Sequence, residues 1–291
     1  MSFISTRSRL ITQFLIGSFL LVHSVMSAAG ALEQLFAPTA DLWADWQAHR
    51  ESSIQQVDHA AWDRFLADNV QRGDDGINRI DYEKVSQADR QGLQAYLSAM
   101  QSVRISDYNR DQQLSYWINL YNATTVEVVL KHYPVESIRD IDISPGLFAD
   151  GPWGKALLTI EGRAVSLNDI EHRILRPIWK DARIHYAVNC ASLGCPNLQP
   201  VSFSVNRINQ QLDSAAREYV NHSRGVRVEG EDLYVSSIYS WFQVDFGKTE
   251  AEVIKHLQLY ARPELARQLN GIEFFTDDHY DWSLNNITEH P

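Results

Sequence analysis

The most continuous apolar pattern in the chain lies between Asp111 and His132, and it predicts a buried helix. On a helical wheel both faces of this stretch are mostly apolar, and a helix that is apolar nearly all round is buried. Pro134 follows closely and should end the helix. Asn119 falls among apolar positions on the wheel, so we expect its amide to be buried and to need hydrogen-bond partners.

Three shorter helices are expected upstream of this stretch. Leu32–His49 and Ala60–Val70 have apolar positions at helical spacing. Asp81 should be the N-cap of a third helix that runs to about Met100. Residues 73–76 before it are acidic and glycine-containing, but they lack the glycine and glutamate positions of a calcium loop. We therefore expect a turn there.

The pattern downstream changes to short elements separated by loops. Small residues, glycine and proline divide it, and apolar residues alternate within it. The expected elements, in order, are short strands and loops over 137–166, a helix from Asn168 to about Pro177, a strand over Arg183–Asn189, a loop over Cys190–Pro200, a helix from Ser204 to about Asn221, a hairpin of Val226–Val228 and Leu233–Val235, a helix from Thr249 to Tyr260, and a strand over Ile272–Phe275.

This mixture predicts an α+β fold with a single domain. The helical N-terminal part should pack on a small mixed or antiparallel sheet. No internal repeat or long flexible linker divides the chain.

The N-terminus has the pattern of a secretory signal peptide. Arg7 and Arg9 precede an apolar run, Leu10–Met26, and small residues follow it. An uncleaved membrane anchor is the alternative, but a run this short is at the lower limit for crossing a bilayer, and polar residues interrupt it. No second stretch approaches that length, so we expect no stable membrane span after cleavage.

Cleavage is expected after Ala29 or Ala31. The chain then divides into a signal peptide at 1–29, a helical extension at 30–59, the main domain at 60–285 and a short tail at 286–291. The mature protein is expected in an exported compartment, the periplasm.

Charge and composition exclude several classes. The chain of 291 residues has 26 Lys and Arg against 37 Asp and Glu, and 44% of its residues are hydrophobic. This composition is globular rather than disordered or fibrous. A protein this acidic is a poor binder of nucleic-acid backbones, so we expect a small-molecule or peptide ligand. Two cysteines cannot form a disulfide-rich scaffold.

Glu171 and His172 lie on the helix that begins at Asn168. Glu171 projects into the middle of its apolar stripe and His172 lies at the edge. A buried carboxylate needs a cation or several hydrogen-bond donors. Glu171 is therefore either one half of a buried ion pair, with an arginine such as Arg139, Arg176 or Arg183, or a group that works with a catalytic histidine.

Cys190 follows directly after the expected strand that contains His185. Small residues after it leave room for a ligand and expose backbone N–H groups, which can lower a thiol pKa or stabilise an oxyanion. A thiolate beside an imidazole is the minimum equipment for cysteine nucleophilic catalysis. Two alternatives remain open: a Cys190–Cys195 disulfide, or a Cys190 that only fills space.

A zinc site is a third alternative. His172, His185, Cys190 and Cys195 are all residue types that bind zinc, but their spacing matches no zinc signature. We therefore expect no metal and no cofactor.

Several strings of residues, taken in order, resemble the family called domain of unknown function 547. The strings are Tyr116–Ala123, Leu167–Pro177, Arg183–Ser192, Ala215–Tyr219 and Tyr280–Asn285. The family occurs in bacteria, often as exported proteins, and in plants. The resemblance implies no reaction, but it directs attention to Asn119, Glu171, His172, His185 and Cys190, which all lie inside these strings.

We therefore expect a cysteine-dependent hydrolase or acyltransferase acting on peptide, amide or small-thiol substrates. Cys190 would be the nucleophile, His172 or His185 the base, Glu171 the group that orients the imidazole, and Asn119 an added polar contact. The order Glu–His–Cys differs from papain-like enzymes, so any similar fold would be rearranged. The alternatives are a non-enzymatic binding or assembly module with a Cys190–Cys195 disulfide, and a zinc-dependent hydrolase. Substrate, oligomeric state and protein partners are not predicted.

Overall fold

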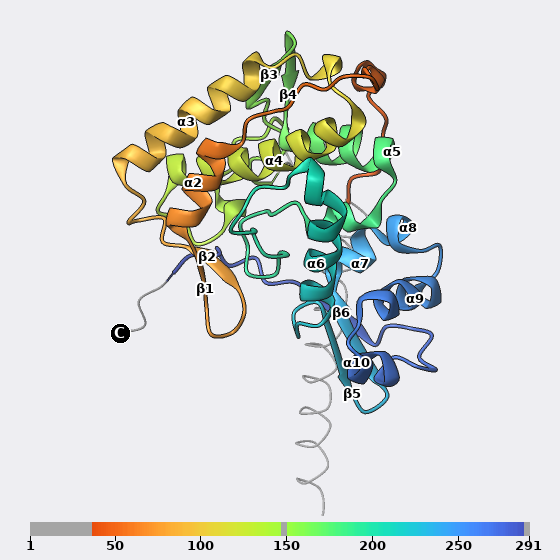
Figure 1. Cartoon of the computed structure of the whole chain (residues 1–291). Coiled ribbons are helices and arrows are strands. Elements are labelled where there is room, and N and C mark those ends of the chain that lie inside the picture. Colours follow the sequence, from red (N-terminus) through yellow and green to blue (C-terminus); the bar gives the residue numbers. More distant parts are fainter. Residues whose placement is uncertain (1–36, 147–149, 288–291) are drawn as a thin grey trace, which may run out of the picture.

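The computed structural model describes residues 37–146 and 150–287, and the expected signal peptide at 1–29 lies outside them. Within the described residues the fold is α+β, as the sequence predicts (Figure 1). The α-helices are α2 (Ala60–Asn69), α3 (Gln87–Ser102), α4 (Arg110–His132), α5 (Arg176–Trp179), α6 (Ile208–Val220), α7 (Ser237–Trp241), α8 (Gln243–Phe246), α9 (Glu250–Tyr260) and α10 (Pro263–Gln268).

The strands are short and, among the described residues, form three separate small sheets rather than one. Two are antiparallel hairpins and the third adds a parallel strand, β7, to the edge of a hairpin. The strands are β1 (Val70–Arg72) with β2 (Asn78–Ile80), β3 (Leu158–Ile160) with β4 (Arg163–Val165), and β5 (Val226–Glu229), β6 (Asp232–Ser236) and β7 (Asp277–His279).

Helix α4 is the centre of the larger part of the molecule. Every residue from Gln112 to Leu130 is buried, because α3, the segment around residue 170 and the short turn at 205–207 pack on the helix, while α2 packs on α3 (Figure 1). The helix ends where the sequence predicts, just before Pro134. Its side chains supply the hydrophobic cluster against which the site described below is built.

The second part of the molecule lies beside the first and is made by α6, α9 and the β5–β6–β7 sheet (Figure 1). Its core is aromatic, with Tyr186, Tyr219 and Tyr239 fully buried. The β5–β6 hairpin and helix α9, capped by Thr249, form where the sequence predicts them.

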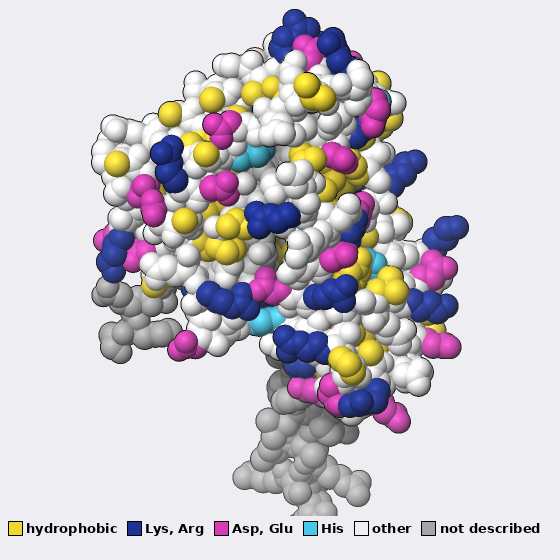
Figure 2. Space-filling view, in the orientation of Figure 1, with side chains coloured by type: hydrophobic (Ala, Val, Ile, Leu, Met, Phe, Trp, Pro, Cys, Tyr) yellow, Lys and Arg dark blue, Asp and Glu magenta, His cyan; other side chains and the backbone are white. Residues whose placement is uncertain are grey.

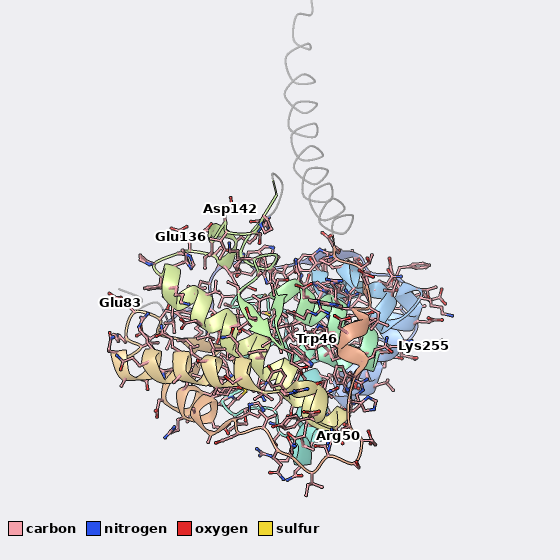
Figure 3. All side chains as sticks on the ribbon, turned by 90° about the horizontal axis from the view of Figure 1, so that it is seen from above. Trp46, Arg50, Glu83, Glu136, Asp142 and Lys255 are labelled. Carbon is pink, nitrogen blue, oxygen red and sulfur yellow. The ribbon has the colours of Figure 1, made fainter. Side chains whose placement is uncertain are left out.

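The N-terminal extension is mostly not helical. In its described part, only Ala44–Gln47 form a short 3₁₀ helix, η1, so the expected helix over 32–49 is wrong there. The ring of Trp46 lies 5.0 Å from that of Trp117 in α4, and η1 lies against the body of the molecule (Figure 3). The described residues before η1 lie along the segment around residue 170, which carries the site.

Three other expected elements are corrected. Ser86, not Asp81, caps α3, because its hydroxyl accepts from Asp89 N, while Asp81 closes a turn after β2. The last strand is Asp277–His279, which pairs with β6, rather than Ile272–Phe275. The expected strand over Arg183–Asn189 is a 3₁₀ helix, η5 (Ala182–Tyr186), packed on α6.

The surface in Figure 2 has basic and acidic side chains interspersed over the whole visible face. Within residues 37–146 and 150–287, no helix has both the length and the apolar character that crossing a membrane requires.

Candidate functional site

A cavity of about 420 Å³ lies where the two parts of the molecule meet. It is lined by residues that are distant in sequence, from Ala37 and Pro38 to Tyr280 and Trp282. Cys190, Glu171, His172 and His185 all line it. Three residues that the sequence selects on chemical grounds, Glu171, His185 and Cys190, therefore share one cavity with His172 from the family-like strings.

A π-helix, η4 (Asp169–Leu175), carries Glu171 and His172. Such wide turns are uncommon and are found often at functional sites. The segment is held at both sides, because the Asp169 carboxylate accepts from Ser166 N and Oγ and Asp41 N donates to His172 O. The wide turn presents the two adjacent side chains to the cavity together.

Glu171 has a histidine, not an arginine, as its ion-pair partner. Its Oε1 lies 3.6 Å from Nδ1 of His185. The three arginines that the sequence offers form other pairs: Arg139 with Asp150, Arg176 with Asp245, and Arg183 with Asp181 and Asp213. The arginine pair, which the sequence leaves open as one of two alternatives, is therefore not formed among the described residues.

Asp245, on α8, lies on the other side of His185. Its Oδ2 is 2.7 Å from His185 Nε2 and 2.5 Å from Arg176 Nε. The Arg176 guanidinium extends this series of contacts to His172. Its Nη1 lies 3.0 Å from His172 Nδ1 and also donates to Pro38 O. Five side chains beneath the cavity thus form one connected series of contacts, here called the charged row: Glu171, His185, Asp245, Arg176 and His172.

The pKa values of the two histidines of this row shift in opposite directions. Burial opposes a charged ring in His185, but the Asp245 and Glu171 carboxylates outweigh it, and its pKa is raised. Burial lowers the pKa of His172 to about 4, so that ring is neutral at pH 7. Because the Arg176 guanidinium donates to Nδ1 of the neutral ring, the proton of His172 is on Nε2.

Both carboxylates of the row are held ionised. Burial tends to raise the pKa of Glu171, but the neighbouring imidazoles of His172 and His185 lower it to about 2. Burial likewise opposes ionisation of Asp245, yet hydrogen bonds from His185 and Arg176 bring its pKa to about 2. The row therefore gives each of these carboxylates a basic partner inside the protein.

Cys190 contacts hydroxyl groups rather than an imidazole. Its Sγ lies 3.0 Å from the Tyr280 hydroxyl and 3.2 Å from Ser192 Oγ, and these two hydroxyls are 3.0 Å apart. Among the described residues, no histidine nitrogen is hydrogen-bonded to this sulfur. The Cys–His hydrogen bond that a papain-like pair would need is therefore not formed.

The hydroxyl contacts favour the thiolate. Burial raises the pKa of the Cys190 thiol, but hydrogen bonds from Cys195 and from the neighbouring hydroxyls outweigh it and leave the pKa below its ordinary value. Burial raises the pKa of Tyr280 well above its ordinary value, so its phenol keeps its proton and can donate it in a hydrogen bond to the sulfur. Cys190 itself is half-buried and reaches the cavity.

The loop after Cys190 is held in an uncommon conformation. Ala191 has φ of 60°, a left-handed conformation that costs a non-glycine residue energy and that is often found at functional sites. The end of the described chain holds it there, because Asn285 N donates to Ala191 O and Leu193 N donates to Ser283 O. The same C-terminal stretch brings Tyr280 to the sulfur.

Asn119 does not belong to the cavity. Its amide Nδ2 donates to Phe203 O at 2.8 Å and its Oδ1 accepts from Phe203 N at 2.9 Å. The amide is buried and fully partnered, as its place on the helical wheel requires. The expected polar contact from Asn119 to the site is therefore wrong.

The remaining walls are mainly aromatic. The rings of Trp241 and Trp282 are stacked at 5.6 Å between centroids, and Trp153 meets Trp282 edge-on at 5.8 Å. The Arg139 guanidinium lies 5.2 Å above the Trp282 ring. A ligand in the cavity would thus meet flat apolar surfaces on one side and the polar row on the other.

Several site residues were missed in the sequence. Nothing in the local pattern marks Asp245, which lies in a short stretch of aromatic residues. Tyr280 and Trp282 had a signal, because they belong to the last string that resembles the family, but spacing alone could not connect them to Cys190.

In the part of the chain that the structure describes, no group of three or more His, Cys, Asp and Glu side chains is arranged to hold a metal ion. Cys190 and Cys195 are free thiols. The zinc-dependent alternative thus has no ligand set in these residues.

Residues 105–220 match the family model described as "Protein of unknown function, DUF547". The resemblance drawn from the sequence strings is confirmed over this range. The matched range includes Glu171, His172, His185 and Cys190, whereas Asp245, Tyr280 and the stacked tryptophans lie outside it. No curated protein and no solved structure matches the chain.

Proposed function

Residues 105–220 belong to the DUF547 family, whose description assigns no reaction, and from the site itself we propose that the protein is a cysteine-dependent acyl hydrolase or acyltransferase. Cys190 is its nucleophile, and the cavity above the charged row binds the acyl group. The observation that carries this proposal is the environment of the Cys190 sulfur, which combines access to the cavity with hydroxyl contacts that favour the thiolate.

Hydrogen-bond donors that lower the pKa of the Cys190 thiol reduce its need for a base. Tyr280 and Ser192 stabilise the charge directly, and His185 cannot take the thiol proton, because carboxylates occupy both of its nitrogens. The base that the sequence suggests is therefore replaced by hydrogen-bond donors.

His172 has a different part in this proposal. Its neutral ring carries the proton on Nε2, and no described residue accepts from that nitrogen. It can therefore donate a hydrogen bond to a carbonyl oxygen in the cavity and stabilise the negative charge that develops there. Glu171 and Arg176 fix the position of this ring through the charged row.

The reaction has two steps. In the first step the Cys190 thiolate adds to the acyl carbon and expels the leaving group, so that the acyl group becomes a thioester on Cys190. In the second step water or another nucleophile takes the acyl group from Cys190. No imidazole is bonded to the sulfur in the described residues, so nothing beside it is set to protonate a departing amine. We therefore expect acyl groups on small thiols, which leave as thiolates, to react faster than peptide or other amides.

Trapping of the acyl-enzyme tests the proposal. The full chain is mixed with an acetyl thioester of a small thiol, quenched in acid, and its mass and peptides are analysed. We expect one acetyl group on Cys190, formed faster in folded than in unfolded protein, and none in Cys190→Ser. Equal rates in the folded and unfolded protein would overturn the proposal.

A second candidate is a non-enzymatic exported binding module. The observation in its favour is that the charged row is fully paired, as a structural network would be. In that case the aromatic walls would bind a ligand, and Cys190→Ser would leave ligand binding intact with no acyl adduct in the wild type. Export to the periplasm belongs to both candidates and is tested by fractionation of the expressed full chain.

A further inference from the structure

Cys190 and Cys195 form a close pair at the edge of the cavity. Both are free thiols, both line the cavity, and Cys190 N donates to Cys195 Sγ at 2.9 Å. The two sulfurs also influence each other's ionisation, because the Cys195 thiol forms a hydrogen bond toward Cys190. The proposed acyl chemistry uses only one of these two thiols.

The two thiols differ in a way that assigns separate roles. Cys190 is half-buried and its pKa is lowered, whereas burial raises the pKa of Cys195 well above its ordinary value, and only 3% of Cys195 is exposed. An accessible cysteine of low pKa next to a second, protected cysteine is the arrangement found in redox-sensing pairs. In such a pair the accessible thiol, here Cys190, is oxidised first, and the protected thiol, here Cys195, then attacks the oxidised sulfur.

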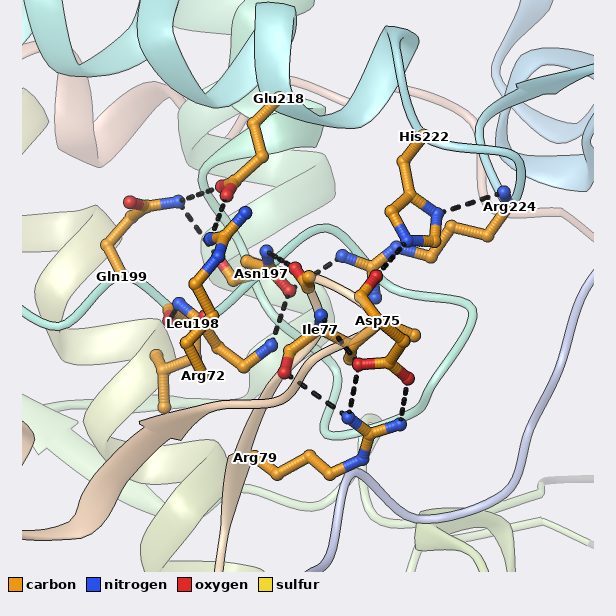
Figure 4. A network of polar contacts seen from close by, with 12 residues as sticks. Arg72, Asp75, Ile77, Arg79, Asn197, Leu198, Gln199, Glu218, His222 and Arg224 are labelled. Carbon is orange, nitrogen blue, oxygen red and sulfur yellow. Dashed lines mark hydrogen bonds and ion pairs between the residues drawn. The ribbon is translucent and has the colours of Figure 1, made fainter.

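The loop between them is fixed on both sides, so the pair stays together. Arg224 donates from Nη1 to Leu193 O at 2.8 Å. Its Nη2 donates to Asn197 Oδ1 at 2.6 Å, within the polar network drawn in Figure 4. On the other side Gly194 N donates to Asp281 O, and a Cβ on Gly194 would lie 2.8 Å from Asp281 N.

We propose that Cys190 and Cys195 are a reversible redox pair that reacts with hydroperoxides. The Cys190 thiolate attacks the peroxide O–O bond, takes one oxygen to become a sulfenic acid, and releases hydroxide. The Cys195 thiol then attacks the Cys190 sulfur, which forms the disulfide and releases water. The two thiols together supply the two electrons that reduce the peroxide, and an external dithiol restores them by exchange.

This pair goes beyond the proposed acyl transfer, although it uses the same nucleophile. The oxidised form has no free sulfur at position 190, so acyl transfer would stop until the disulfide is reduced. Cys195 thereby protects Cys190 from irreversible oxidation and turns the site off.

The experiment uses the reduced full chain and hydrogen peroxide. Free thiols are counted with time, and peptides are mapped without reduction. We expect the wild type to lose both thiols, to gain a Cys190–Cys195 disulfide and to recover both thiols with dithiothreitol. Cys195→Ser should stop at a sulfenic acid on residue 190 that dimedone captures, and Cys190→Ser should be oxidised far more slowly.

Three results would overturn the redox pair. In the first, the wild type keeps both thiols in the presence of peroxide. In the second, residue 190 of the wild type is oxidised to the sulfinic acid as readily as in Cys195→Ser. In the third, a disulfide forms but dithiothreitol does not reduce it in the folded chain. Acetyl transfer to Cys190 in reduced protein, measured in parallel, separates this failure from that of the proposed function. An acetyl adduct without disulfide formation rejects the redox pair alone.

Discussion

His185 Nε2 lies 2.7 Å from Asp245 Oδ2 and joins the 3₁₀ helix η5 to the short helix α8. The contact connects the family-matched part of the chain to residues outside it. Asp245 also forms an ion pair with Arg176, so one carboxylate is the partner of two buried basic side chains. Loss of that carboxylate should therefore cost more than loss of a surface partner.

Asp245→Asn should lower the free energy of unfolding by about 3 to 5 kcal/mol, the usual cost of removing one partner of a buried ion pair. The measurement is urea denaturation of the purified chain at neutral pH. Asp213→Asn is the matched control, because Asp213 pairs with Arg183 at a more exposed position and should contribute less than about 1 kcal/mol. Equal effects of the two variants would show that the row is not a buried network.

Stability should fall as the pH is lowered from neutral. Burial lowers the pKa of His59, His172 and His256 to about 4. Between about pH 6.5 and pH 4 the unfolded chain therefore binds more protons than the folded chain. The contribution of these histidines to the free energy of unfolding is complete above about pH 6.5 and is lost as the pH falls through about 4. The measurement is the melting temperature against pH.

Glu171 and Asp245, with pKa values near about 2, extend the loss of stability to lower pH. Their contribution is complete above the ordinary carboxyl range and disappears as the pH falls toward 2. His59→Gln should flatten the curve only between pH 6.5 and 4. A melting temperature that is constant over that range in the wild type would contradict the buried neutral histidines.

Asn119→Ala should lower the free energy of unfolding by about 1 to 3 kcal/mol, because it leaves both backbone groups of Phe203 without their partner. The pH dependence of Cys190 alkylation should stay unchanged, since Asn119 lies outside the cavity. Denaturation and alkylation measured on the same variant check both statements. A shifted alkylation profile would return Asn119 to the site.

Tyr280→Phe removes a hydroxyl from the Cys190 sulfur and keeps the ring against Trp241 and Trp282. The apparent pKa of Cys190 should therefore rise while the melting temperature changes little. The measurement is the iodoacetamide rate against pH, with Tyr234→Phe on strand β6 as the matched control. An unchanged profile in Tyr280→Phe would mean that this hydroxyl does not stabilise the thiolate.

The sequence predicts those parts of the fold whose pattern is local. Helix α4 has apolar residues on both faces and Pro134 after its end, so its burial follows from its own residues. The β5–β6 hairpin is similarly marked by alternation and a central glycine. Such elements need little information from the rest of the chain.

The remaining elements depend on contacts between distant segments. Arg183–Asn189 alternates like a strand, but in residues 37–146 and 150–287 no strand pairs with it. It forms a 3₁₀ turn instead, in which Ile184 and Tyr186 are buried in different hydrophobic clusters. Tyr82 donates to Asn285 Oδ1 and so holds residues after Asp81 in a turn.

The candidate site was predicted in part for the same reason. The burial of Glu171 followed from the helical wheel, and Cys190 followed from its small neighbours. Asp245, the second partner of His185, and Tyr280, the partner of Cys190, come from segments that only the tertiary structure brings close. An acidic residue among aromatic residues has no local feature that would mark it as the partner of His185.

The pH dependence of Cys190 alkylation in the reduced wild-type chain tests the account most directly. Peptide mapping identifies the cysteine that reacts with iodoacetamide, and the rate is followed from acid to alkaline pH. We predict that Cys190 reacts first, with an apparent pKa below the ordinary thiol value of about 8.5. A Cys190 that titrates at or above that value, or that reacts only when the chain unfolds, would contradict a nucleophile at this cavity.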